Sequence, residues 1–150
     1  MDFSFADKIN TALFLITALG VVAAFWQIRL SARTQRAIFL KDLYMQLNGD
    51  PNLIKAYYLI EYDLFKYDEN FHNSTVEADI DRLLTIINLI CELYQQGIIS
   101  KREMSFFDYR FKRVSRNNDI KKYLESLKAF YTTNDVSKKP FEKFQEYVGD

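Results

Sequence analysis

The chain has 150 residues, a formal net charge of zero, a hydrophobic share of 49% and an aromatic share of 16%. This length allows one small domain beside a membrane segment. The single cysteine, Cys91, excludes an intrachain disulfide and is typical of a reducing compartment. Four glycines and two prolines leave few breaks, so we expect few and long helices or strands.

An uncharged apolar segment runs from Ile9 to Trp26, near the start of the chain. A helix of this length, at about 1.5 Å per residue, nearly crosses a hydrocarbon layer of about 30 Å. Its polar residues, Asn10, Thr11 and Thr17, are tolerated in such a helix, whereas a Lys or Arg would not be. The segment therefore predicts a transmembrane helix over residues 9–26.

Two alternatives to a membrane span are a cleaved secretory signal and a buried core helix. A signal peptide would begin with a basic leader, but the leader contains Asp2 and Asp7 beside Lys8. A core helix of a soluble bundle would keep a polar face, whereas the polar residues here form only a narrow stripe. The pattern favours the span.

The flanks of this segment predict its orientation. Residues 1–8 are slightly acidic, and the sequence after the segment is basic. Short segments rich in Lys and Arg stay on the cytoplasmic side, so we expect residues 1–8 outside and residues 27–150 as a cytosolic helical domain. The residues expected at the membrane interface are Trp26, Arg29, Arg33 and Arg36.

Helical periodicity runs through nearly the whole chain and predicts an all-α fold. Neither Gly nor Pro interrupts residues 21–48, so we expect the membrane helix to continue into the cytosol as one rod. Gly49 is the expected C-cap of this rod. Pro51 is expected to open a second helix over residues 52–66.

A third helix is the most strongly patterned part of the chain. Ser74 and Glu77 are spaced as a capping box at its start, and Gly97 follows its expected end. Its apolar residues recur at helical spacing and predict a core face. These residues are Ile80, Leu83, Leu84, Ile87, Ile90, Cys91 and Tyr94.

Shorter helices complete the predicted bundle. Ser100 and Glu103 form a second capping box, for a fourth helix that ends near Arg116. Asp119 is the expected cap of a fifth helix, and Pro140 opens a short last one.

No residue pattern indicates catalysis. His72 is the only histidine and lies in a polar loop, and Cys91 lies on an apolar helix face. Two such residues cannot form a zinc site. Asp79 and Asp81 lie near a helix start, where negative charge complements the helix dipole. We therefore predict a non-enzyme with no catalytic residue, metal or cofactor.

A stripe of small and polar residues follows the predicted span. Asn10, Thr17 and Ala24 recur at a spacing of seven, and Gly20 lies beside them. Seven residues return a helix to nearly the same face, and such side chains let membrane helices approach each other. Chance is the alternative, because these residues are common in spans. If several copies assemble around the stripe, it could line a narrow polar pore.

A basic cluster is the second feature, and it admits three interpretations. It could form salt bridges to neighbouring subunits on a solvated face, bind a phosphate-bearing ligand, or contact anionic lipid. The lipid interpretation applies better to the arginines after the span. Interleaved aromatic residues could stack bases. The residues of the predicted ligand site are Arg110, Lys112, Arg113, Arg116, Lys121 and Lys122.

Several segments occur together after the acidic leader and the span. They are the break at GDP and the segments AYYLIEYDLFKYDENF, DRLLTIINLICELYQQGIIS and RVSRNNDIKKYLESL. In this combination the chain resembles a family of small bacterial membrane-anchored helical proteins, and it is similar in shape to membrane effectors of Hailong-type anti-phage defence. The resemblance implies a homo-oligomeric inner-membrane channel, for instance a tetramer, with an oligonucleotide ligand and a nucleotidyltransferase partner encoded nearby.

The resulting hypothesis is a homo-oligomeric membrane effector, a small ion channel controlled by a ligand or partner at its cytosolic domain. The alternative hypothesis is a single-span tether whose cytosolic helices recruit a protein partner without conduction. A tether needs no polar stripe in its span, so the stripe distinguishes the two.

Overall fold

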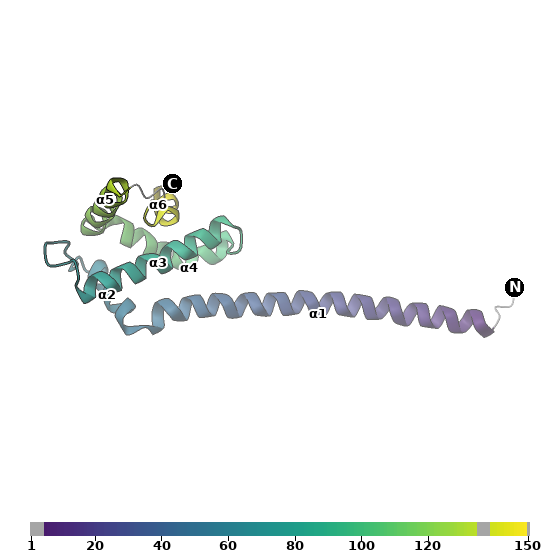
Figure 1. Cartoon of the computed structure of the whole chain (residues 1–150). Coiled ribbons are helices and arrows are strands. Elements are labelled where there is room, and N and C mark those ends of the chain that lie inside the picture. Colours follow the sequence, from purple (N-terminus) through teal and green to yellow (C-terminus); the bar gives the residue numbers. More distant parts are fainter. Residues whose placement is uncertain (1–4, 135–138, 150) are drawn as a thin grey trace. The chain divides into compact units, whose positions relative to one another are not determined.

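The computed structural model describes residues 5–134 and 139–149, and this part of the chain is helical with no strand (Figure 1). The all-α prediction is confirmed. The chain divides into two compact units, Met1–Tyr44 and Met45–Asp150. The first unit holds most of the helix α1 (Phe5–Gly49). The helices that lie wholly in the second unit are α2 (Pro51–Glu61), α3 (Thr75–Gln95), α4 (Lys101–Arg116), α5 (Asn118–Thr133) and α6 (Glu142–Gly149).

Helix α1 is continuous over 45 residues. It contains both the predicted span, residues 9–26, and the predicted rod, residues 21–48, without an interruption. The expectation of one long N-terminal helix followed by a helical bundle is therefore confirmed.

The end of α1 differs from the prediction. Gly49 is the last helical residue and does not adopt the left-handed conformation of a glycine C-cap, whereas Gly97 does, with a φ of 73°. Helix α1 ends because Asp50 has an extended backbone, with φ −88° and ψ 115°. This conformation is the one favoured before a proline, here Pro51.

Helix α2 is shorter than the predicted 52–66. Beyond its end, the backbone N–H groups of Leu64 and Phe65 both donate to the carbonyl oxygen of Leu59, at 2.8 Å each. This turn brings Phe65 into the core, where its side chain is buried. The predicted extension was wrong because burial of this aromatic ring competes with continuation of the helix.

Helix α3 supplies the central face of the core and packs against α2, α4 and α6. Tyr94 remains partly exposed, and Gly97 follows the helix with a positive φ, as expected for a helix stop. The other residues of the predicted face are all buried, namely Ile80, Leu83, Leu84, Ile87, Ile90 and Cys91.

The two predicted capping boxes have different outcomes. At α4 the box is complete, because Ser100 and Glu103 each bond to the backbone of the other. At α3 only half forms: Ser74 Oγ accepts from the Glu77 backbone N–H at 3.1 Å. The Glu77 carboxylate instead accepts from the Asn73 backbone N–H at 2.6 Å, so the reciprocal bond is shifted by one residue.

The N-cap of α5 is Asn117, and the predicted Asp119 is not the cap. Asn117 Oδ1 accepts from the backbone N–H groups of Asp119 and Ile120, at 3.0 Å each. Asn117 is only 3% exposed, and its Nδ2 also donates to Asp63 Oδ1 at 3.2 Å. An amide both accepts and donates, so it can cap α5 and contact the end of α2; an ionised aspartate only accepts.

Helix α6 begins two residues after the proline that was expected to open it. Pro140 and Phe141 form a turn, in which Phe141 has a φ of 50°, and the helix starts at Glu142. The backbone N–H of Phe144 donates to Asn88 Oδ1 of α3 at 3.1 Å, and the Phe144 ring is fully buried. This docking places α6 over the core of the bundle.

Candidate functional site

The N-terminal part of α1 is long and apolar enough to cross a membrane. None of its most apolar 18-residue window is buried, and its large side chains, such as Phe14 and Phe25, are exposed. A core helix of a soluble protein would be mostly buried. In length and composition this helix is a candidate membrane span.

The stripe of this helix is exposed along its length. Asn10, Thr17, Gly20 and Ala24 are all accessible, and a Cβ added to Gly20 would meet no atom within 4 Å. Thr17 Oγ1 donates to the Leu13 carbonyl at 2.8 Å, so its hydroxyl is satisfied within the helix. The stripe therefore offers a flat surface that a second helix could approach closely.

The basic flank of the segment is also exposed. Trp26, Arg29, Arg33 and Arg36 are separated by three or four residues and lie on one side of α1. This arrangement suits a membrane interface, where an indole ring and long basic side chains reach the headgroup layer.

The predicted ligand residues separate into two groups in the bundle. Arg113 is a structural clamp: its Nε donates to the Glu61 carbonyl at 3.2 Å, and its Nη2 to Asp63 Oδ2 at 2.7 Å. The bond with Asp63 raises the pKa of Arg113. The clamp holds the end of α2, so the guanidinium is already occupied.

Arg110 and Lys122 are also engaged within the bundle. The guanidinium of Arg110 lies 4.7 Å from the centre of the Tyr57 ring. The Tyr57 hydroxyl donates to Glu61 Oε2 at 2.7 Å, and this bond lowers the pKa of Glu61. Lys122 pairs with Asp119 at 3.0 Å. Both contacts lie within one chain, whereas the salt-bridge interpretation placed the partners of the cluster in neighbouring subunits.

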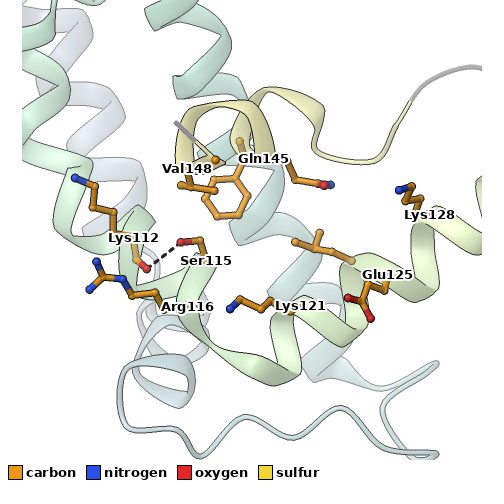
Figure 2. A pocket seen from close by; sticks show the side chains of 11 residues that line it. Lys112, Ser115, Arg116, Lys121, Glu125, Lys128, Gln145 and Val148 are labelled. Carbon is orange, nitrogen blue, oxygen red and sulfur yellow. Dashed lines mark hydrogen bonds between the residues drawn. The ribbon is translucent and has the colours of Figure 1, made fainter.

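The remaining predicted residues, Lys112, Arg116 and Lys121, line a cavity of about 600 Å³ between α4, α5 and α6 (Figure 2). Lys128 and Glu125 of α5 line it too. Lys112 pairs with Asp108 at 2.9 Å. The apolar and neutral part of the lining consists of Ser115, Leu124, Phe144, Gln145, Val148 and Gly149.

Lys128 is a cavity residue that the sequence analysis missed. Lys121, Glu125 and Lys128 are spaced i, i+4 and i+7, so they share one face of α5. This spacing was a usable signal. No signal in the sequence indicates that α6 lies opposite that face, because its position depends on how the last helix docks.

Cys91 and His72 do not line the cavity. Cys91 is fully buried, and burial raises the pKa of its thiol to about 12, so the thiolate is not formed near neutral pH. His72 Nδ1 lies 2.8 Å from Glu77 Oε1 in an exposed loop. Within residues 5–134 and 139–149, no three metal-binding side chains gather.

The chain matches no protein-family model, and neither a curated protein nor a solved structure is significantly similar to it. The candidate sites of this protein are the apolar segment of α1, the basic flank of this segment and the cavity of the bundle, each defined by its own residues.

Proposed function

We propose that this protein is a homo-oligomeric, single-span effector of the bacterial inner membrane, a small channel controlled through its cytosolic bundle. The observation that carries the proposal is the apolar window of α1, of which nothing is buried. Exposed apolar area of this extent is unfavourable in water and favourable in lipid. Carbonate extraction of membranes tests the span: the protein should stay in the pellet, and its release would contradict the proposal.

The pore is proposed to form at the stripe, where several copies meet. Purified protein in planar bilayers should conduct, and Asn10→Leu or Thr17→Leu should change the conductance because each replaces a polar side chain of the stripe. Ile16→Leu, which lies one position off the stripe, is the matched control and should leave the current unchanged. Equal currents in all variants would contradict a pore at this face.

Control from the bundle is supported by the continuity of α1 from residue 21 to residue 48. An uninterrupted helix can transmit a tilt or rotation, whereas a flexible linker cannot. The signal is proposed to be a phosphate-bearing ligand, such as an oligonucleotide, or a partner protein. A role in anti-phage defence follows from the resemblance alone, and a nucleotidyltransferase gene beside this one would support it.

A tether without conduction is the second candidate, favoured by one surface. The aromatic patch, formed by Tyr58, Tyr62, Phe106 and Tyr109, is exposed on the bundle. The rings of Tyr58 and Tyr62 stack with their centres 5.8 Å apart, and the Tyr109 hydroxyl donates a hydrogen bond to Glu61 Oε1 at 2.7 Å. Such a patch is typical of protein contacts.

Replacing residues 9–26 by a poly-Leu helix of equal length separates the two functions. A tether should still recruit its partner protein, since it needs only an anchor. A channel should lose its conductance, because the poly-Leu helix lacks the stripe.

A further inference from the structure

We infer that the cavity between α4, α5 and α6 binds a compact oligophosphate, a molecule with two or more linked phosphate groups. That this ligand controls the channel rests on the proposed function. The binding itself is measured without conduction, so either idea can fail while the other stands.

The charge of the lining selects the ligand class. Lys112 is paired with Asp108, whereas Arg116, Lys121 and Lys128 form no ion pair with a described residue. Among the described residues of the lining, these three cations are accompanied by one carboxylate, Glu125, so this part of the lining has an excess of two positive charges. A ligand with at least two negative charges complements this excess, and Arg and Lys are both common phosphate-binding residues.

The two neutral polar side chains of the described lining each donate a hydrogen bond within the bundle. Ser115 Oγ donates to the Lys112 carbonyl at 3.0 Å, as Figure 2 shows, and Gln145 Nε2 donates to the Pro140 carbonyl at 2.7 Å. Of their donors, only the second N–H of the Gln145 amide remains for a sugar or an amide. Recognition is left to the cations, which favours an anionic ligand over a neutral polar one.

The cavity has no platform for a base. Among the described residues of the lining Phe144 is the one aromatic, and its side chain is fully buried against Phe111, with ring centres 6.4 Å apart. A buried ring edge cannot stack a nucleobase. The same phosphates could come from free polyphosphate or from a nucleotide, and in both cases the phosphates provide the affinity.

Calorimetry on the full-length protein in a zwitterionic detergent tests the site, with inorganic tripolyphosphate as the probe. Tripolyphosphate should bind at low salt, and its affinity should fall as salt is added, because the cations are exposed to solvent and their charge is screened. AMP, with a single phosphate, should bind at least about tenfold more weakly than tripolyphosphate. ATP should bind within about threefold of tripolyphosphate, since the base adds little.

A matched pair of variants on α5 locates the binding. Lys121→Gln should weaken tripolyphosphate binding by about 5- to 10-fold. Lys122→Gln makes the same charge change on the neighbouring residue, which does not line the cavity, and should leave binding unchanged. Glu125→Gln should strengthen binding by about threefold, a gain that a merely destabilised protein could not show.

Equal losses in Lys121→Gln and Lys122→Gln would overturn the site, because they would indicate general surface attraction. No gain in Glu125→Gln would also overturn it. ATP binding far more tightly than tripolyphosphate would overturn the ligand class, since a base or ribose would then be recognised. Specific binding by a protein that never conducts would refute the channel and retain the site.

Discussion

Phe14 of α1 and Phe111 of α4 are the same residue type in opposite surroundings. Phe14 is 73% exposed, whereas Phe111 is 1% exposed and contacts the rings of Phe107, Phe144 and Tyr147. In the bundle, apolar residues recur on one face of each helix and are buried by the neighbouring helices. In the apolar part of α1 they surround the helix, so no single protein partner could cover them all.

The proposed span would place one chain in two solvents, with lipid around the apolar part of α1 and water around the bundle. A substitution should therefore affect either folding or insertion, depending on its region.

The largest expected effect is in the bundle core. Phe111→Ala should lower the free energy of unfolding by about 4 kcal/mol, because it removes a buried ring and leaves a cavity. Chemical denaturation of the protein in detergent, followed by circular dichroism, measures the change. Phe14→Ala is the matched control and should leave the unfolding of the bundle unaltered. An equal loss in both would mean that α1 is a core helix of a soluble fold.

The next effect concerns insertion. Ile16→Arg places a charge near the middle of the predicted span and should disfavour insertion by about 3 kcal/mol. The fraction that resists carbonate extraction should fall, while the unfolding midpoint of the bundle stays constant. Ile16→Leu should insert like the original chain. Full insertion of the arginine variant would argue against this depth in the membrane.

A smaller effect on stability is expected at the N-cap of α5, which contacts the segment after α2. Asn117→Ala should lower the free energy of unfolding by about 1–2 kcal/mol, since it removes the N-cap and the bond to Asp63. Asn118→Ala, on the adjacent exposed residue, should change it by less than about 0.5 kcal/mol. If both variants behave alike, the cap does not link the two helices.

The smallest effect is a pH-dependent one. Burial raises the pKa of Asp81, even though the Tyr123 hydroxyl donates to it. The folded state therefore binds the proton more tightly than the unfolded state, and stability falls as pH rises from the ordinary pKa through the raised one. Asp81→Asn keeps the acceptor, so at pH 7 it should stabilise the bundle by less than about 1 kcal/mol.

Thermal unfolding as a function of pH measures this difference, which should vanish at pH values below both pKa values, where Asp81 is protonated in either state. Asp79→Asn removes a charge from the same turn of α3 and serves as the control for the helix dipole. A gain of the same size in Asp79→Asn would assign the effect to the dipole and not to burial.

The predicted helices were most accurate where the signal was local. The face of α3 from Ile80 to Cys91 and the capping box of Ser100 and Glu103 depend only on residues within one helix, and both are present. The errors occurred where a contact with a residue far away in the chain outweighs the local sequence pattern. Asn117 replaced Asp119 as the cap because its side chain also reaches Asp63 of the α2–α3 connection.

The candidate site follows the same division. Sequence spacing grouped six cations, but it could not show that Arg113 meets Glu61 and Asp63, some 50 residues earlier in the chain. It also omitted Lys128, whose place in the cavity depends on the docking of α6.

The sequence by itself determined the helical class, the uncharged apolar segment and most helix limits, because these follow from composition and from interactions within a few residues. Only the tertiary structure decided that Arg113 is neutralised by Glu61 and Asp63 and which cations surround a cavity. Lys112 and Lys122 pair with Asp108 and Asp119 of their own helices, whereas Arg113 pairs with Glu61 and Asp63, which lie far from it in the chain. The packing of α2 against α4 brings these last groups together, and the docking of α6 closes the cavity.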